Sequence, residues 1–365
     1  MTRDSKHDIE NDIRHWVRPE IRALSAYHVP DPGDCIKLDA MENPYRWPDD
    51  LVNAWLERLR TAPLNRYPDP SARRLQTRLR EAMQVPQDMA VLLGNGSDEL
   101  IQMIVQTVAA PGRVILAPEP TFVMYRIIAQ VFGLNFAGVP LTDDFALNVD
   151  AMLEAIDVHQ PAVVFLSYPN NPTGNLFDAA TVRRIIAAAP GLVVVDEAYA
   201  AFAADSFMDV LGEYPNLLVL RTVSKMGLAG LRLGMLAGPA AWLNEIDKTR
   251  LPYNINVLTQ LSAEFALEHR DVLTAQTAQI RVDRTLLLAA LQSLPGVTVY
   301  PSEANFILFR TPTGQATAIF TALRERRILI KNLSHAGGAL ADCLRVTVGA
   351  PAENAAFLEA LRAVL

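Results

Sequence analysis

The sequence predicts an α/β protein with a large domain built on a doubly wound, mostly parallel sheet and a second, smaller α+β domain. Three observations lead to this prediction. Short apolar runs alternate with helical stretches between residues 90 and about 240. These runs are rich in β-branched residues at consecutive positions, which is typical of strands buried on both faces. After residue 253, a long helical stretch precedes a second group of strand-like runs.

Composition limits the classes of protein that the chain can belong to. Its 365 residues, half of them hydrophobic, are enough for two domains with large cores. The net charge of −7 argues against a nucleic-acid partner. No apolar run approaches the roughly 18 residues of a membrane span, and the charged N-terminus lacks the apolar segment of a signal peptide. Cys35 and Cys343 lie far apart without metal-ligand spacing, which favours reduced thiols, no metal site and a cytoplasmic protein.

The expected elements follow in chain order. Residues 1–35 are polar with scattered apolar side chains and are expected to form an N-terminal arm. Residues 51–60 place apolar side chains on one helix face, and we assign residues 36–62 to the smaller domain. The Pro-rich loop 63–70 opens the large domain, which is expected to cover residues 63–252. Its expected strands are 91–94, 113–117, 162–168, 192–199, 217–222 and 233–238, with helices such as 99–109 and 179–189 between them.

Residues 253–365 are expected to form the main part of the smaller α+β domain. A helical stretch over residues 256–294 comes first. Strand-like runs then occur at 297–300, 305–309, 327–331 and 343–349, followed by a last helix over 353–365.

Polar residues gather where apolar runs of the large domain end, and ligands bind at that edge of an open α/β sheet. Residues 94–98 (GNGSD) follow the first run and precede a helix, so their N–H groups and the Ser97 hydroxyl can hold an anion. An ordinary helix N-cap is the alternative. The rigid loop 169–174 (PNNPTG) presents Asn170 and Asn171 to a ligand, or is simply a well-made turn.

Two further strand ends carry charge. Asp196 ends a fully apolar run, where a carboxylate is costly unless a cation such as a protonated ring nitrogen pairs with it. Lys225 follows another run, close in sequence to Thr222, Ser224 and Arg232. Desolvation there lowers the pKa of an amine, as a Schiff-base lysine requires, whereas a solvated surface lysine is the alternative. An anion cradle, an amide, a buried carboxylate and a poised amine together match the needs of pyridoxal 5′-phosphate (PLP).

At this point the chain resembles a known family. It is similar to the class I/II PLP-dependent aminotransferases of fold type I, and among them most closely to the histidinol-phosphate aminotransferase group. The resemblance runs from about Tyr27 to the C-terminus. The motifs that carry it are ENPY (42–45), LNRYPDP (64–70), GNGSDEL (94–100), PEPTFVMY (118–125), YPNNPTGN (168–175), VVDEAYAAF (194–202), RTVSKMGLAGLRLG (221–234) and CLRVTVG (343–349).

The resemblance implies a PLP cofactor and roles for the residues at matching positions. Lys225 would bond to the cofactor aldehyde and then act as the general base of the proton shift. Asp196 would hold the ring N–H, and Asn171 and Tyr199 would hydrogen-bond the phenolic oxygen. Tyr125 would stack on the ring. The phosphate would be held by Gly96, Ser97, Asp98, Thr222, Ser224 and Arg232, joined by Tyr67 from the other subunit of a homodimer.

One spacing departs from the pattern that the resemblance implies. Lys225 and Arg232 are seven residues apart instead of eight. Gly227 and Gly230 lie between them and could absorb the difference, because glycine tolerates unusual backbone angles. Arg232 is therefore still expected at the phosphate.

The resemblance also implies a reaction, the transamination of L-histidinol phosphate with 2-oxoglutarate in histidine biosynthesis. The products would be imidazole acetol phosphate and L-glutamate. Arg345, Lys331 and Tyr27 would hold the substrate's phosphate beside Asn171, and Arg345 would also receive the carboxylate of 2-oxoglutarate. Three alternatives stay open: an aromatic amino-acid aminotransferase, a threonine-phosphate decarboxylase and a non-catalytic PLP-binding protein.

Overall fold

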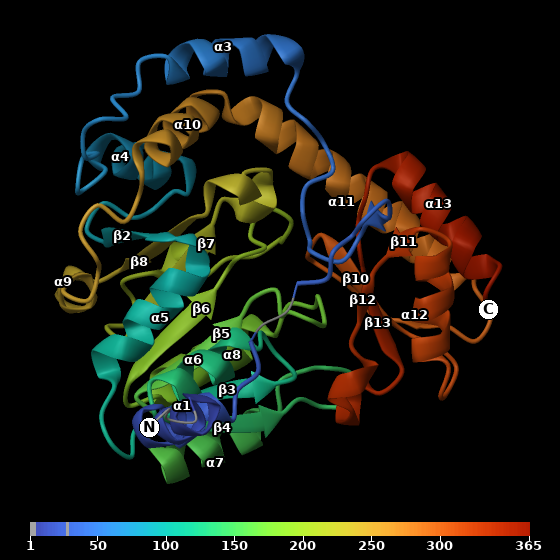
Figure 1. The fold of residues 1–365 in the computed structure, drawn as a ribbon, viewed down its shortest axis with the longest axis horizontal. Helices are drawn as coiled ribbons and strands as arrows, with labels where there is room; N and C mark the ends of the chain where they lie inside the picture. The colour runs from blue at the N-terminus through green and yellow to red at the C-terminus, as the bar shows by residue number, and fades with distance from the viewer. Residues whose placement is uncertain (1–4, 27–28) are drawn as a thin grey trace.

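The computed structural model describes residues 5–26 and 29–365. Its larger sheet has seven strands in the order β2-β8-β7-β6-β5-β3-β4 among these residues (Figure 1). Neighbouring strands are parallel except that β8 runs antiparallel to both β2 and β7. The predicted doubly wound, mostly parallel sheet is thereby confirmed. The strands are β2 (Ala90–Asn95), β3 (Val114–Glu119), β4 (Asn135–Pro140), β5 (Val163–Ser167), β6 (Leu192–Asp196), β7 (Leu217–Thr222) and β8 (Leu233–Gly238).

Helices cover both faces of this sheet. Buried side chains of three helices pack on one face and those of three others on the opposite face. The central strands β5 and β6 are buried along their whole length, which explains their unbroken apolar sequences. One face carries α5 (Gly96–Val108), α6 (Met124–Val131) and α9 (Ala240–Asp247); the other carries α4 (Arg73–Ala82), α7 (Val149–His159) and α8 (Ala179–Ala188).

Strand β4 was not predicted from the sequence. It is the edge strand of the sheet, and of its residues only Val139 is buried. Because most of the strand is partly exposed, its sequence NFAGVP has no continuous apolar run to signal a buried strand.

The smaller domain contains a four-stranded sheet in the order β12-β13-β10-β9. A separate parallel pair joins β1, near the N-terminus, to β11. The expected helix over 256–294 is divided at His269 into α10 and α11. These elements are β1 (Ile36–Lys37), α10 (Val257–Glu268), α11 (Arg270–Gln292), β9 (Thr298–Val299), β10 (Phe306–Arg310), α12 (Ala316–Glu325), β11 (Ile328–Leu329), β12 (Lys331–Asn332), β13 (Cys343–Thr347) and α13 (Pro351–Arg362).

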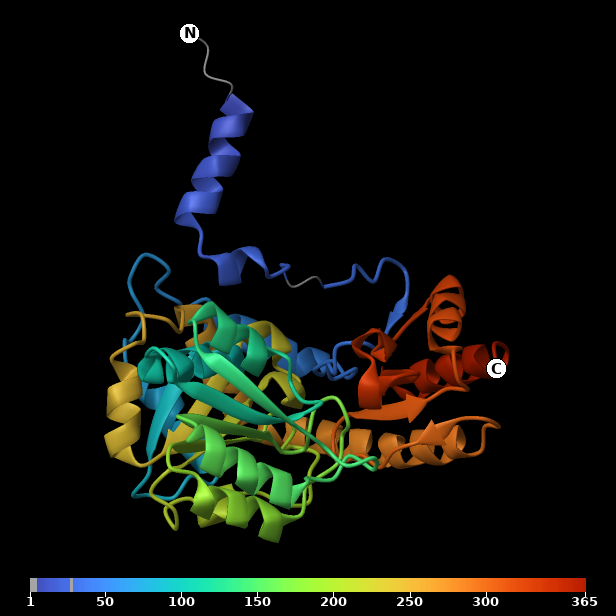
Figure 2. The ribbon, with the colours of Figure 1, turned by 90° about the horizontal axis from the view of Figure 1, so that it is seen from below.

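The N-terminal segment forms two helices, α1 (Ser5–Trp16) and α2 (Pro19–Arg22). Helix α1 stands away from the body of the protein (Figure 2). Helix α3 (Asp49–Leu59) packs on α10, where Trp55 Nε1 donates to Ser262 Oγ at 2.9 Å. Helix α10 in turn contacts α4 of the large domain. Helix α3 belongs to residues 36–62, which the sequence assigns to the smaller domain, and its contacts are with α10. The division of the chain at residues 35, 62 and 252 remains a prediction.

Short 3-10 helices complete the fold. They are η1 (Met208–Val210), η2 (Ser224–Met226), η3 (Ala229–Leu231), η4 (Ser334–Ala336) and η5 (Gly338–Leu340). Within residues 5–26 and 29–365, no helix has the length and apolar character needed to span a bilayer. The same residues contain no group of three or more His, Cys, Asp or Glu side chains placed to hold a metal ion.

Candidate active site

A cavity of about 100 Å³ lies at the ends of β5, β6 and β7. Strand register brings these ends together, because Ser167 of β5 pairs with Asp196 of β6. Nine of the predicted cofactor residues line the cavity, although they come from four separate stretches of the chain. The lining residues are Met41, Ser97, Asp98, Phe122, Ser167, Asn171, Asp196, Ala198, Tyr199, Thr222, Ser224, Lys225 and Arg232.

Lys225 lies on η2, directly beyond β7. Its Nζ is 3.4 Å from the Ala40 carbonyl oxygen and 5.8 Å from the centroid of the Tyr199 ring. Burial, reinforced by the nearby Arg345 guanidinium, lowers the pKa of Lys225 to about 8. A neutral amine is therefore accessible near physiological pH, as a nucleophile or general base requires.

Asp196 is the last residue of β6 and is buried. Its Oδ1 accepts a hydrogen bond from the Ala198 N–H at 3.1 Å, and its Oδ2 accepts one from the Tyr125 hydroxyl at 2.7 Å. Burial raises the pKa of Asp196 to about 6 in spite of these donors. A cation against this carboxylate would hold it in the charged form, so the residue suits a protonated pyridine nitrogen.

The anion cradle forms where β2 passes into α5. Gly96 has a φ of +79°, and a Cβ added there would lie 2.6 Å from Arg232 Nη2. The guanidinium therefore lies directly against the backbone at the start of α5, where free N–H groups already favour an anion. Arg232 Nη2 also lies 3.2 Å from Asp98 Oδ2. This donor set fits a phosphate group.

The short spacing between Lys225 and Arg232 is accommodated in a way that differs in part from the expectation. Gly227 adopts a φ of +115°, as expected for a residue that absorbs the missing position. Gly230 does not adopt a positive φ, and Arg232 itself takes a φ of +47° instead. The other cradle side chains are close by, with Thr222 Oγ1 2.8 Å from Ser224 Oγ.

Behind the cradle, a hydrogen-bond network connects β2 to the segment after α9. Asn254 Nδ2 donates to Glu99 Oε2 at 2.9 Å and to the Leu93 carbonyl at 3.2 Å. The Asn95 N–H also donates to Glu99 Oε2, at 2.6 Å, and Asn95 Nδ2 donates to the Asn254 carbonyl at 2.7 Å. Glu99 and Asn254 together fix the backbone immediately before Gly96.

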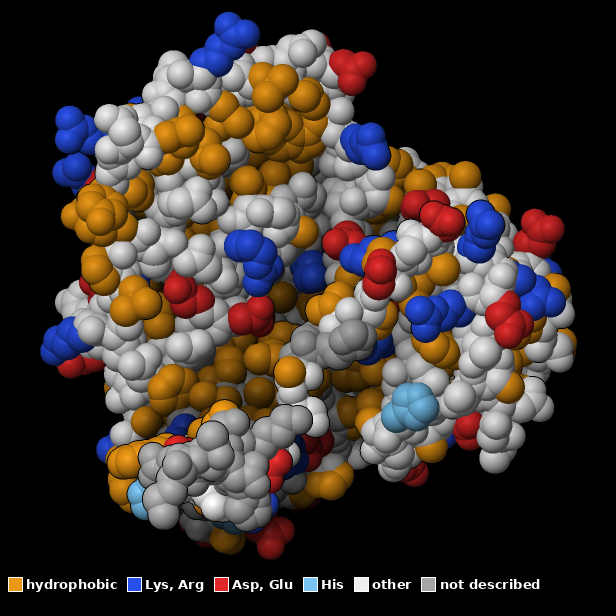
Figure 3. All heavy atoms as spheres, in the orientation of Figure 1, with side chains coloured by type: hydrophobic (Ala, Val, Ile, Leu, Met, Phe, Trp, Pro, Cys, Tyr) orange, Lys and Arg blue, Asp and Glu red, His pale blue; other side chains and the backbone are white. Residues whose placement is uncertain are grey.

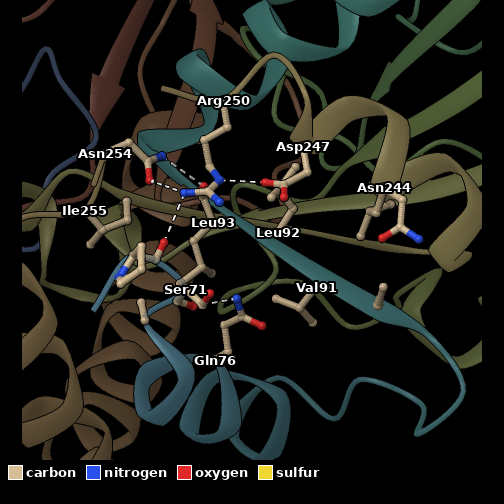
Figure 4. Close-up of a pocket in the computed structure, with 14 residues that line it drawn as sticks. Ser71, Gln76, Val91, Leu92, Leu93, Asn244, Asp247, Arg250, Asn254 and Ile255 are labelled. Atoms are coloured by element: carbon tan, nitrogen blue, oxygen red, sulfur yellow. Dashed lines mark hydrogen bonds and ion pairs between the residues drawn. The ribbon is translucent and has the colours of Figure 1, made fainter. Parts of the chain in front are cut away.

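The same network continues to Pro70, at the end of the loop that carries Tyr67. Arg250 projects between Asp247 and Asn254 in a second, polar cavity (Figure 4). Its Nε donates to Asp247 Oδ1 at 2.6 Å, and its Nη1 lies 3.1 Å from the Pro70 carbonyl and 3.4 Å from Asn254 Oδ1. The cradle and the 63–70 loop are thus held by one set of contacts.

Tyr125 does not occupy the position expected for it. The side chain is fully buried, and its ring stacks on Phe165 with centroids 4.6 Å apart. It lies behind the cavity wall, with its hydroxyl on Asp196. Phe122, three residues earlier, lines the cavity instead. The prediction that Tyr125 stacks on a cofactor ring is therefore wrong, because the backbone around the start of α6 turns Phe122 toward the cavity and Tyr125 into the core.

Two other predicted residues lie outside the cavity. Tyr67 is 79% exposed, and its ring stacks on Tyr253 with centroids 4.4 Å apart. It does not line the cavity of its own chain. Tyr27 lies outside the described residues.

A larger cavity of about 300 Å³ adjoins the first and shares Met41, Phe122 and Asn171 with it. Arg345 lines this cavity; its Nη1 donates to Asn171 Oδ1 at 2.6 Å and its Nη2 to the Asp39 carbonyl at 3.1 Å. Asn171 Nδ2 then donates to the Tyr199 hydroxyl at 3.2 Å. Asn171 therefore connects the two cavities through hydrogen bonds at both ends of its amide.

The larger cavity has a cationic side and an apolar side. Lys331 lines it beside Arg345, which is its partner in the β12–β13 register. Glu119 of β3 and Arg126 of α6 also line the cavity and form an ion pair at 2.7 Å, so these two charges neutralise each other. The apolar lining residues include Phe122, Val123, Phe136, Leu333 and Leu340.

Sequence reasoning missed two residues that line both cavities. Phe122 stands in the PEPTFVMY motif, in which the resemblance implies Tyr125 as the ring-stacking residue. Met41 directly precedes ENPY and adopts a φ of +53°, which is uncommon outside glycine. Its N–H donates to Thr347 Oγ1 at 3.0 Å, and its carbonyl accepts from Asn305 at 3.0 Å. Nothing in the local sequence signals this contact between residue 41 and residues about 300 positions away.

Comparison with known proteins gives concordant results. Residues 33–361 match the family of class I and II aminotransferases. The chain is 62% identical over 351 residues to histidinol-phosphate aminotransferase 2 of Nitrosococcus oceani, covering 96% of this chain and 98% of the relative. It is 54% identical over 354 residues to histidinol-phosphate aminotransferase 1 of Ralstonia nicotianae, covering 96% of this chain and 94% of the relative.

A solved structure agrees with the fold. The histidinol-phosphate aminotransferase of Sinorhizobium meliloti, solved in complex with pyridoxal-5′-phosphate, superimposes with a TM-score of 0.85 at 25% identity. The superposition covers 96% of this chain and 97% of that one. With the family match over nearly the whole sequence, these similarities show that the chain belongs to the class I and II aminotransferases.

Proposed function

We propose that this enzyme transfers the amino group of L-histidinol phosphate to 2-oxoglutarate, giving imidazole acetol phosphate and L-glutamate in histidine biosynthesis. One observation carries the proposal: the cavity with Lys225 and Asp196 opens beside a cavity in which Lys331 and Arg345 are adjacent. A cavity with a reactive amine and a cavity with two cations suited to an anion thus lie side by side. The histidinol-phosphate aminotransferases to which the chain is 54–62% identical support the same reaction.

The cofactor is PLP, and the residues present fit it. The cradle at Gly96 and Arg232 suits the phosphate, and buried Asp196 suits the pyridinium nitrogen. Tyr199 accepts a hydrogen bond from Asn171, which leaves its own hydroxyl proton to donate to a ring oxygen. We assign Ser97, Asp98, Thr222 and Ser224 to the phosphate as well, and Phe122 in place of Tyr125 to the ring face. When bound, PLP supplies an electron sink for negative charge at the substrate's Cα.

The chain's own groups then perform the proton chemistry. Lys225 carries an amine with a pKa of about 8, so part of it is neutral at pH 7 and can take the proton from Cα. The same ammonium, once formed, can return the proton to a different carbon. Arg345 Nη1 donates to Asn171 Oδ1 at 2.6 Å. This hydrogen bond fixes the guanidinium, which in this proposal orients the substrate relative to Lys225.

Charge in the larger cavity determines which substrates bind. A phosphate ester carries close to two negative charges at neutral pH, and two adjacent cations at Lys331 and Arg345 match it. We propose that Arg345 also receives the carboxylate of 2-oxoglutarate in the second half-reaction. The apolar lining at Phe122 and Phe136 would contact a flat ring. This lining also favours a second candidate, an aromatic amino-acid aminotransferase.

A half-reaction experiment decides between these candidates. Protein loaded with PLP is mixed with L-histidinol phosphate in the absence of a keto acid, and loss of the yellow absorbance is followed. L-phenylalanine and O-phospho-L-threonine are tested at the same concentration. We expect fast bleaching at low histidinol phosphate concentration. Equal or faster bleaching with phenylalanine would refute the substrate assignment, release of CO₂ from phosphothreonine would indicate a decarboxylase, and no bleaching with any amine would refute catalysis.

We also propose that the enzyme acts as a homodimer in the cytoplasm. Tyr67 is exposed, does not line the cavity of its own chain, and stacks on Tyr253. Such a residue can complete the phosphate cradle of a second copy. Cys35 and Cys343 are both free thiols, which supports a reducing compartment.

A further inference from the structure

The hydrogen bond from Tyr125 to Asp196 has no role in the function proposed above. The Tyr125 hydroxyl lies 2.7 Å from Asp196 Oδ2, and both side chains are buried. Tyr125 comes from α6 and Asp196 from β6, 71 positions later in the chain. The contact is therefore made by the tertiary fold, at the carboxylate that faces the cavity.

The surroundings hold the Tyr125 ring in one orientation. The ring lies parallel to Phe165, with an interplanar angle of 7°. Phe122 meets it edge-on, with centroids 5.5 Å apart. A ring packed on two sides in this way cannot move its hydroxyl away from the carboxylate without disturbing the core.

The two carboxylate oxygens of Asp196 are distinguished by their donors. Oδ2 accepts from the Tyr125 hydroxyl, and Oδ1 accepts from the Ala198 N–H at 3.1 Å. The titratable groups that act on Asp196 are Asp98 on α5 and the adjacent Glu197, which both disfavour its charged form, and the hydroxyls of Tyr125 and Tyr199. Of these groups, Tyr125 is the one that donates a hydrogen bond to the charged carboxylate.

We propose that Tyr125 is a positioning residue, which keeps Asp196 ionised and oriented and thereby keeps the proton of the ion pair on the cofactor's ring nitrogen. A donor on Oδ2 makes the carboxylate a weaker base. Without it, Asp196 would compete for the ring proton, and the ring would become a poorer electron sink. The inference rests on the role proposed for Asp196, but its central claim concerns the carboxylate itself and is measurable without cofactor.

The experiment uses cofactor-free protein and follows the infrared carbonyl band of protonated Asp196 as a function of pH. The band is assigned by its absence in Asp196→Asn. We expect Tyr125→Phe to raise the protonation midpoint of Asp196 by about one pH unit, because a hydrogen bond to the charged form is lost. An unchanged or lower midpoint in Tyr125→Phe would overturn the inference.

Tyr168→Phe is the matched control. Tyr168 is also a buried tyrosine, and its hydroxyl donates to a carboxylate, Asp205 Oδ2, at 2.9 Å. Neither Tyr168 nor Asp205 lines the cavity that contains Asp196. Tyr168→Phe should leave the midpoint of Asp196 unchanged, and a shift equal to that of Tyr125→Phe would mean that the effect is a general loss of packing.

A second variant keeps the test decisive if Tyr125→Phe does not fold. Replacement of Tyr125 by 3-fluorotyrosine retains the ring and makes the hydroxyl a stronger donor, so the midpoint of Asp196 should fall. In PLP-loaded protein, the same substitution should shift the pH titration of the cofactor's absorbance in the opposite sense to Tyr125→Phe. If Asp196→Asn retains full activity, the role proposed for Asp196 fails, whereas the infrared midpoints alone decide the role of Tyr125.

Discussion

Lys331 and Arg345 face each other across the antiparallel strands β12 and β13, and both line the larger cavity. Like charges in directly paired positions repel each other and lower stability. An anion between them would remove this cost, which supports the proposal that the pair binds a phosphate or carboxylate. The charge pattern of the smaller sheet is thus consistent with the acidic part of the proposed substrate.

Replacing Lys331 tests this anion site. Lys331→Gln should raise the KM for histidinol phosphate roughly ten- to hundredfold, because a charge-assisted hydrogen bond contributes about 1.5–3 kcal/mol. Lys331→Arg should retain most of the affinity, and Lys248→Gln, at an exposed pair with Glu245, should change nothing. Steady-state kinetics provide the measurement. An equal rise in the KM for phenylalanine would show that Lys331 acts on structure rather than on the phosphate.

Gly96→Ala should weaken PLP binding at least tenfold. The new Cβ would lie 2.6 Å from Arg232 Nη2 and displace the guanidinium from the cradle. Gly112→Ala is a matched control, since Gly112 has the same φ of +79° but open space around its Cα. Both variants should lose about 1–2 kcal/mol of unfolding free energy from backbone strain. PLP titration of the cofactor-free protein measures the difference, and equal affinities for the two variants would contradict the cradle.

Lys225→Met should stabilise the cofactor-free protein in a pH-dependent way. The folded state lowers the pKa of Lys225 from its usual 10.5 to about 8, so the charged form is destabilised. That cost is fully present below pH 8 and disappears as the pH rises toward 10.5. The melting temperature of Lys225→Met should therefore exceed that of the wild type at pH 7, and the gain should shrink by pH 10. A gain that is the same at both pH values would show that desolvation of this amine is not its source.

Asn254→Ala should loosen the cradle from behind. It removes the amide that donates to Glu99 and to the Leu93 carbonyl, so the Glu99 carboxylate loses one hydrogen-bond donor. We expect a loss of about 1–3 kcal/mol of stability and weaker PLP binding. Asn244→Ala is the control, because Asn244 lines the same polar cavity (Figure 4) but forms no side-chain hydrogen bond among the described residues. Chemical unfolding and PLP titration distinguish the two variants.

Mixed dimers test the placement of Tyr67. The inactive Lys225→Ala chain retains Tyr67, and a Tyr67→Ala chain retains Lys225. If Tyr67 completes the cradle of a second copy, a dimer of these two chains contains one complete site. Mixing should then give more activity than the sum of the separate variants. Activity equal to that sum, in a mixture shown to contain heterodimers, would place Tyr67 in its own chain's site. Figure 3 shows groups of hydrophobic side chains on the face of the molecule that it presents.

The sequence by itself predicted six of the seven strands of the central sheet and the main chemical groups. The apolar runs that end at Asp196 and before Lys225 are typical of strands buried on both faces, and parallel strands end at one edge. Their terminal polar residues therefore had to meet. For this reason Lys225, Asp196, Asn171 and the 94–98 loop could be placed in one site without a structure.

The tertiary structure decided what depends on side-chain direction and on register between distant segments. Phe122 and Tyr125 are three residues apart, and the start of α6 at Met124 directs one to the cavity and the other to Asp196. The edge strand β4 is half exposed and left no apolar signal in the sequence. The pairing of Lys331 with Arg345 needed the strand register. Long-range contacts of this kind follow from how elements pack together, which local residue patterns do not encode.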